Sequence, residues 1–200
     1  MTISAAQVKE LREKTGLGLM DCKKALEEAN GNIDLAIEEL RKTSGVKASK
    51  KSGRSAADGL IAIMGNGQGC FMIEVNCETD FVARDESYIQ FTEETLKTYA
   101  NNSEKDLEQL LEEGIDANRE KLVQKLGENI VVRRVARTLD SAVTGSYLHS
   151  NKKIGCLVSL EGGSESLAND IAMHAAATDP MAVSPDDIPK DIVDKEREIF

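Results

Sequence analysis

The chain has 200 residues, of which 40% are hydrophobic and 30% are charged, and its formal net charge is −10. This composition is that of an ordinary globular protein with one domain of moderate size or two smaller ones, and no apolar run reaches the roughly 18 residues that a membrane-spanning helix needs. Phosphate contacts supply much of the affinity of nucleic-acid-binding proteins, so the acidic balance also argues against direct binding of DNA or RNA.

Residues 1–45 are predicted to form three short helices. Ser4 and Asn32 are suited to cap the first and third helices, and a glycine-containing turn at 15–18 ends the first. In the third helix, apolar residues recur at helical spacing: Ile33, Ala36, Ile37 and Leu40. Such a unit is small, but domains of similar size fold alone.

Residues 46–56 are rich in small and basic residues, which predicts a flexible linker. The functional alternative is an RNA-binding patch at 47–54. No aromatic residue is interleaved there to stack on bases, which favours the linker.

Residues 57–186 are predicted to form two related α+β subdomains, at 57–140 and 141–186. Apolar runs at 59–64 and 70–77 flank a glycine-rich turn, which predicts a β-hairpin. Three helices and a third strand are expected after it, at 85–100, 104–112, 116–126 and 130–136. A second hairpin over 143–161 and a helix over 166–178 repeat this order.

The last residues, 187–200, begin a charged helix with Pro189 near its first turn. The second subdomain still lacks a counterpart of the third strand when the chain stops. We therefore expect this chain to be truncated at its C-terminus and the subdomain at 141–186 to be incomplete.

No catalytic motif is visible, and we expect neither a metal nor another cofactor. His149 and His174 could each act as a base, ligate a metal or fill a structural role. The four cysteines follow neither zinc nor redox spacing, so we interpret them as reduced, buried side chains: Cys22, Cys70, Cys77 and Cys156. The N-terminus also lacks the pattern of a signal peptide, and together these features favour a cytoplasmic protein.

Phe81 occupies a junction between a predicted strand and a predicted helix. A large aromatic side chain at such a junction is either a core residue beneath the helix or an exposed anchor for a partner. Asp80, directly before it, could be the N-cap of the helix. The spacing leaves both roles of Phe81 open.

Two segments resemble the signatures of the elongation factor Ts family. They are Thr15-Gly-Leu-Gly-Leu-Met-Asp-Cys-Lys-Lys-Ala-Leu26 and Glu74-Val-Asn-Cys-Glu-Thr-Asp-Phe-Val-Ala83. Three shorter matches follow in the family's order: 127–130 together with 133–135, then 145–149, and then 171–174. The resemblance covers essentially the whole chain, and five motifs in order are far more specific than any one of them.

This resemblance implies a fold and a function. The fold would be a ubiquitin-associated-like module at 1–45, a core of two α+β subdomains, and the start of a helical hairpin at 187–200. The function would be that of a non-catalytic guanine-nucleotide exchange factor, whose partner is elongation factor Tu in its GDP-bound and nucleotide-free forms. No direct contact with nucleic acid or membrane is implied.

The resemblance also assigns roles to particular residues. The stretch that displaces magnesium from the partner would be Thr79, Asp80, Phe81 and Val82. Other partner-binding residues would be Met20, Lys23, Leu126, Gly127 and His149. Two alternatives remain: a small enzyme with a site around His149 or Cys77, and an adaptor whose helical module binds ubiquitin-like partners. Turnover of a small substrate without a partner would favour the enzyme, whereas the translational context of the family argues against the adaptor.

Overall fold

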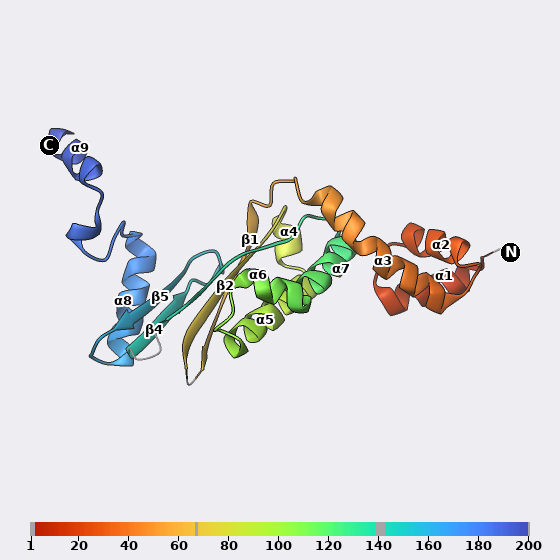
Figure 1. Cartoon of the computed structure of the whole chain (residues 1–200), viewed down its shortest axis with the longest axis horizontal. Coiled ribbons are helices and arrows are strands. Elements are labelled where there is room, and N and C mark those ends of the chain that lie inside the picture. Colours follow the sequence, from red (N-terminus) through yellow and green to blue (C-terminus); the bar gives the residue numbers. More distant parts are fainter. Residues whose placement is uncertain (1–2, 67, 139–142, 200) are drawn as a thin grey trace.

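The computed structural model describes residues 3–66, 68–138 and 143–199. The molecule is elongated, with helices at its N-terminal end, a sheet covered by helices in the middle, and a small hairpin with one helix beyond it (Figure 1). The architecture is α+β, as predicted. Among the described residues, no helix is both long and apolar enough to cross a membrane.

The N-terminal helices pack around their own apolar cluster. They are α1 (Ala5–Thr15), α2 (Leu19–Glu28) and α3 (Ile33–Lys51). Ser4 caps α1 and Asn32 caps α3, which confirms both predicted caps. The cluster consists of Leu11, Leu17, Cys22, Ala25, Leu26, Ala36 and Leu40. We call these helices the helical module.

Helix α3 continues well past the helical module and reaches the central core. Ala48, near its end, is 2% exposed and belongs to the apolar cluster of the core. This part of α3 packs against α7 (Asp116–Leu126) so closely that a Cβ on Gly45 would lie 3.0 Å from a carboxylate oxygen of Glu120. The prediction of a flexible linker at 46–56 is therefore wrong for residues 46–51, because packing on α7 outweighs their weak local preferences.

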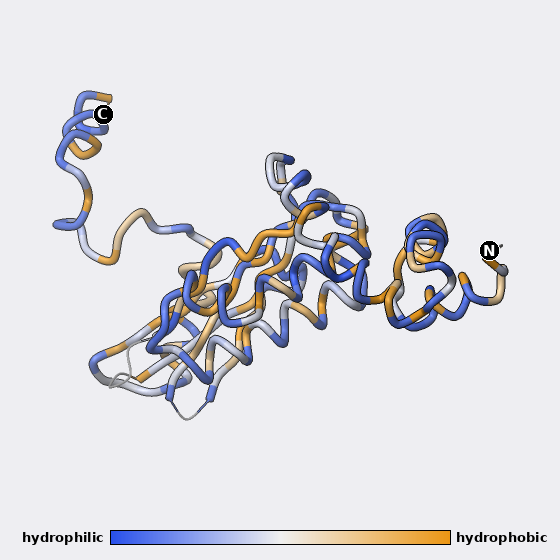
Figure 2. Tube along the Cα trace, turned by 45° about the vertical axis from the view of Figure 1, so that its right-hand side comes forward, coloured by the Kyte–Doolittle hydropathy of each residue, from blue (hydrophilic) through white to orange (hydrophobic). Residues whose placement is uncertain are grey.

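The central sheet is antiparallel, with β2 (Gly69–Cys77) between β1 (Asp58–Asn66) and β3 (Val131–Arg137). The buried side chains of β2 alternate along the strand and face α5 (Glu86–Asn101): Phe71, Ile73 and Val75. Figure 2 shows hydrophobic stretches gathered in the middle part of the molecule.

Shorter elements connect the strands and helices of this core. Helix α4 (Asp80–Ala83) follows β2 directly. In place of a single helix over 104–112, the structure has α6 (Leu107–Leu110) and a kinked segment (Leu111–Ile115), in which Gly114 is non-helical at φ 128°. Helix α7 ends at Gly127, which is left-handed at φ 81°.

A second, smaller unit follows the described part of the core. The strands β4 (Val143–Leu148) and β5 (Gly155–Leu160) form an antiparallel hairpin that is covered by α8 (Glu165–Thr178). The hairpin packs on the face of the central sheet opposite α5, where a Cβ on Gly155 would lie 2.9 Å from Ile61. A short 3-10 turn (Pro185–Asp187) and α9 (Lys190–Ile199) complete the described chain.

Candidate partner-binding site

Phe81 lies on the surface, with 82% of its area exposed. It belongs to the single turn of α4, whose next two residues, Val82 and Ala83, are buried against the core. The turn is therefore anchored on one side and presents an aromatic ring to solvent on the other. Of the two roles that the spacing left open, this exposure excludes a core residue, and the role of an anchor for a partner stays a prediction.

Thr79, and not Asp80, caps this turn. The Thr79 hydroxyl accepts a hydrogen bond from the backbone N–H of Val82 at 3.4 Å. Asp80 is the first residue inside the helix, where its carboxylate lies 2.9 Å from Arg84. The Arg84 side chain is 80% exposed and the Asp80 side chain 48%, so this ion pair contributes little to stability. The prediction of Asp80 as the N-cap is wrong by one residue.

Glu128, which precedes the neighbouring strand β3, holds the turn before Phe81. One of its carboxylate oxygens accepts the Thr79 hydroxyl at 2.6 Å, and the other accepts the backbone N–H groups of Glu78 and Thr79 at 3.0 Å each. Glu78 in turn accepts the backbone N–H of Asn129 at 2.6 Å. Hydrogen bonds to ionised acceptors are stronger than neutral ones, so the two turns clamp each other firmly.

Asn129 connects this clamp to the segment that follows α3. Its side chain is 2% exposed and donates to the backbone carbonyls of Ser52 at 3.3 Å and Arg54 at 2.9 Å. Lys51, at the end of α3, donates to the carbonyl of Gly127. Three segments of the chain thus meet at the turn that precedes Phe81, which gives that turn a rigid base.

Leu126 and Gly127 therefore lie beside the Phe81 turn, although they are distant from it in sequence. Leu126 is partly buried and packs against the core, whereas Gly127 is exposed. Glu128 and Asn129 were not among the residues predicted for the site. The only signal for them was that they lie in the 127–130 motif.

His149 lies at the end of β4 on the same end of the sheet. Its turn is fixed to the start of β1: Lys152 accepts from the backbone N–H of Ile61 at 2.8 Å, and Lys153 pairs with Asp58. Asp58 is paired across the ladder with Cys77, shortly before the Phe81 turn. The His149 ring is exposed, and its Nδ1 lies 2.9 Å from the hydroxyl of Tyr147.

Cys77 is unsuited to nucleophilic chemistry. The residue is buried, and its thiol donates to the backbone carbonyl of Thr79 at 3.2 Å. Burial raises its pKa to about 11, so the thiol stays protonated at neutral pH. Among the described residues, no group of three or more side chains is arranged to hold a metal ion.

Met20 and Lys23 form a separate exposed patch on α2. Met20 is 76% exposed, and the Lys23 side chain is 53% exposed and lies 3.8 Å from Glu27. Their spacing places them on one face of the helix, opposite the buried face with Cys22 and Leu26. The structure does not bring this patch to Phe81, since α2 and α4 belong to separate parts of the molecule (Figure 1).

Comparisons with known proteins agree with one another. A family model described as Elongation factor TS matches residues 78–200. The chain is 52% identical over 200 residues to Elongation factor Ts of Marinobacter nauticus, and the match covers 99% of this chain and 69% of that protein. It is also 52% identical to Elongation factor Ts of Hahella chejuensis, with 99% and 70% covered. For the protein of that name from Arthrospira platensis the identity is 47%, with 99% and 83% covered.

Proposed function

This chain belongs to the elongation factor Ts family of translation elongation factors, and we propose that it acts as a guanine-nucleotide exchange factor. It binds elongation factor Tu in the GDP-bound state, displaces the magnesium ion and promotes release of GDP, leaving a complex with the nucleotide-free GTPase. It works in the cytoplasm and needs no cofactor, nucleic acid or membrane of its own.

The observation that supports this proposal most directly is the exposure of Phe81 on a rigid base. A ring that is 82% exposed has most of its apolar surface left to bury in a partner. Burying a Phe side chain contributes roughly 1.5–3 kcal/mol. Each tenfold change in affinity corresponds to about 1.4 kcal/mol. This contact alone therefore weakens the binding of GDP to elongation factor Tu by about ten- to a hundredfold.

The rest of the effect comes from the metal and from additional contacts. At equilibrium, the nucleotide and the exchange factor weaken each other's binding to the GTPase by the same factor. Any contact that forms only in the nucleotide-free state therefore favours release of GDP. Loss of magnesium also removes the charge that neutralises the phosphates of GDP. The segment 79–82 performs this displacement, and further contacts are made by Met20, Lys23, Leu126, Gly127 and His149.

Exchange of this kind requires no catalytic base and no nucleophile on this chain. It requires a wedge that keeps its position while the partner deforms, and the clamp of Glu128 on Thr79 provides that rigidity. The alternative of an enzyme built on Cys77 is weakened by the raised pKa of its thiol.

The test is the rate at which elongation factor Tu releases fluorescent GDP, with wild-type protein and with Phe81→Ala. We expect the acceleration of GDP release by the variant to be at least about tenfold smaller than the acceleration by the wild-type protein. Its free energy of unfolding should change by less than about 0.5 kcal/mol, as is usual for exposed positions. Val183→Ala, which shortens another exposed apolar side chain, is the matched control.

Two outcomes would contradict the proposal. One is a wild-type protein that leaves GDP release unchanged. The other is a Phe81→Ala variant that loses about 3–5 kcal/mol of stability, as a buried Phe would, while exchange per folded molecule stays the same.

A further inference from the structure

A cleft of about 350 Å³ lies where the helical module meets the core. Residues of α1 and α3 form one wall, and residues of α5 and α7 form the other. Its volume lies within the usual range for small-molecule sites, which is roughly 300–1,000 Å³. It is separate from the Phe81 turn and from the exposed patch on α2, because none of those residues lines it.

The cleft has an apolar floor drawn from both parts of the molecule. Leu17 and Leu40 come from the helical module, and Phe91 and Leu122 come from the core. Each of the four is less than a tenth exposed. An apolar body entering the cleft would therefore meet a surface that is already ordered.

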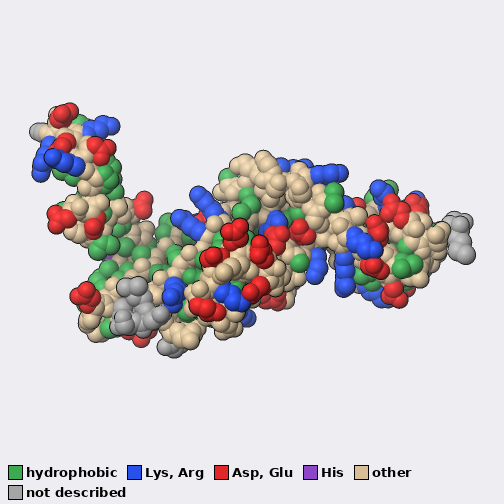
Figure 3. All heavy atoms as spheres, viewed as in Figure 1, with side chains coloured by type: hydrophobic (Ala, Val, Ile, Leu, Met, Phe, Trp, Pro, Cys, Tyr) green, Lys and Arg blue, Asp and Glu red, His purple; other side chains and the backbone are tan. Residues whose placement is uncertain are grey.

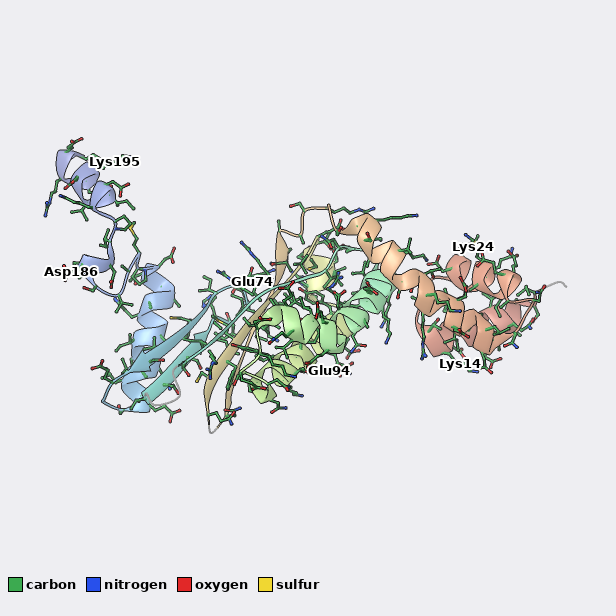
Figure 4. All side chains as sticks on the ribbon, viewed as in Figure 1. Lys14, Lys24, Glu74, Glu94, Asp186 and Lys195 are labelled. Atoms are coloured by element: carbon green, nitrogen blue, oxygen red, sulfur yellow. The ribbon has the colours of Figure 1, made fainter. Side chains whose placement is uncertain are left out.

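The charged side chains around this floor are mostly cationic. They are Lys14, Arg41, Lys121 and Lys125, against one carboxylate, that of Glu94. Lys14 of α1 and Glu94 of α5 are labelled in Figure 4, on the same side of the molecule. The resulting net charge of +3 is unusual on a chain whose overall charge is −10. Figure 3 likewise shows blue side chains where the helical module joins the core.

Two of these cations, Arg41 and Lys125, make no ion pair with a described residue, although the charge of Lys125 acts on the carboxylate of Asp85. In the described part of the chain, neither Arg41 nor Lys125 has a carboxylate within ion-pair distance. Lys14 is bound by Glu10 at 2.8 Å, and Lys121 lies 3.3 Å from the amide oxygen of Asn118. Arg41 and Lys125 line the cleft from opposite walls, α3 and α7.

Gln124 adds a third polar group to the same lining. Its side chain is 8% exposed, and its Nε2 has no hydrogen-bond partner among the described residues. A buried amide donor without an acceptor is unfavourable. An oxygen atom of a ligand would relieve this once the amide turned toward the cleft.

We propose that this cleft binds a small amphipathic anion, with an apolar body on the leucine and phenylalanine floor and a carboxylate or phosphate between Arg41 and Lys125. The apolar part gains from leaving water, and the anionic part gains charge-assisted hydrogen bonds from two cations on different walls. A bound anion joins the helical module to the core.

The first experiment uses the amphipathic anion 8-anilinonaphthalene-1-sulfonate and the whole chain. We expect its fluorescence to rise with a saturable 1:1 stoichiometry and to weaken as salt is added. Decanoate and decyl phosphate should displace it, and their relative strengths distinguish a carboxylate ligand from a phosphate ligand. Decanol, which has the same apolar body without the charge, should compete at least about tenfold more weakly.

The second experiment places the binding in the cleft. Arg41→Glu combined with Lys125→Glu should weaken binding at least about tenfold, and the milder pair Arg41→Gln with Lys125→Gln should weaken it less. Lys9→Glu combined with Lys195→Glu reverses the same number of charges at exposed positions outside the cleft and should leave binding unchanged. Circular dichroism checks that all variants remain folded.

The proposal is overturned if the cleft variants bind the probe as tightly as the control variant does. It is also overturned if decanol displaces the probe as well as decanoate does, because the cations would then have no part in binding.

Discussion

Glu128 shows how much of the candidate site depends on one partly buried side chain. Its carboxylate accepts from the Thr79 hydroxyl and from two consecutive backbone N–H groups, so it fixes the turn that precedes Phe81. Phe81 itself has no comparable restraint, since most of its ring is exposed. The position of the ring is therefore set by its neighbours.

We predict that Glu128→Gln lowers the free energy of unfolding by about 1–3 kcal/mol, because an amide cannot accept from all three donors and places its own NH₂ against some of them. GDP release from elongation factor Tu should also slow, since the turn under Phe81 loosens. Urea unfolding and nucleotide release measure the two effects. Glu112→Gln, at an exposed position, serves as control, and a Glu128→Gln protein with unchanged stability and exchange would show that the clamp is dispensable.

Glu74 links the stability of the fold to pH. It lies on β2 and bridges Arg133 and Arg134 of β3. Burial acts to raise the pKa of this carboxyl, but hydrogen bonds and the nearby arginine charges outweigh burial and hold the pKa below its ordinary value of 4.5. A carboxyl with a lowered folded pKa stabilises the fold above its unfolded pKa, and that contribution is lost as pH falls through the folded pKa.

Glu74→Gln should therefore cost about 1 kcal/mol of unfolding free energy at pH 7, since both arginines are largely exposed. The difference between wild type and variant should shrink as pH falls below 4.5. Denaturant unfolding at a series of pH values measures it. A difference that stays constant from pH 7 to the acid range would mean that the carboxylate charge has no role.

The residues of the site differ in how well the sequence predicted them. The strand-to-helix junction identified Phe81 as unusual, but its exposure depends on which side of α4 packs on the core, and four residues are too few to show a periodicity. The clamp could not be predicted at all, because Glu128 is 49 residues away from Thr79 along the chain. A hydrogen bond of that kind leaves no pattern in a sequence.

Among whole elements, the beginnings of the helices were easier to predict than their ends. Ser4 and Asn32 cap α1 and α3 through contacts within three residues, and such local signals are visible in a sequence. The end of α3 depends on burial of Ala48 against the core and on the fit of Gly45 against α7. Small residues that predict a linker are also what a close helix-to-helix contact requires. The predicted linker at 46–56 is wrong for residues 46–51, and the division of the chain into domains stays a prediction.

Gly145 lies where strand β4 and helix α8 approach each other closely. A Cβ at this position in β4 would lie 2.3 Å from the carbonyl carbon of Ala168 and 2.5 Å from the backbone nitrogen of Asn169, both in α8. Gly145→Ala should push the helix away from the hairpin and lower the unfolding free energy by about 1–3 kcal/mol. Thermal or denaturant unfolding measures this loss.

Gly162→Ala is the matched control for that change, because no atom lies within 4 Å of a Cβ at Gly162. This substitution should change stability by no more than about 0.5 kcal/mol. Equal changes in unfolding free energy at Gly145 and Gly162 would show that α8 can move away from β4 without a loss of stability.

For the molecule as a whole, the proposed contacts with elongation factor Tu fall into two separate places, the exposed face of α2 and the region around Phe81. Substitutions at distant sites without shared partners usually have additive free energies. We therefore predict that the fold-losses in affinity of Met20→Ala and Phe81→Ala multiply in the double variant. Binding titrations of both single variants and the double variant test this.

Leu35→Ala is a suitable control in the same titrations, because Leu35 is exposed on the helical module but belongs to α3. It should leave affinity unchanged. If the double variant binds as tightly as the single variant of lower affinity, Met20 and Phe81 do not contribute as independent contacts.

The continuity of α3 has a geometric consequence for this arrangement. Leu40 lies in the core of the helical module and Ala48 in that of the central sheet, with uninterrupted helix between them. In an α-helix each residue adds a rotation of about 100° and a rise of about 1.5 Å. Deleting one residue between these two anchors would turn the face that bears Met20 relative to the central sheet by roughly a quarter of a circle. Inserting four residues would turn it by about 400°, which is close to one full circle, and would nearly restore its direction. The number of residues in this stretch therefore decides where the helical module points.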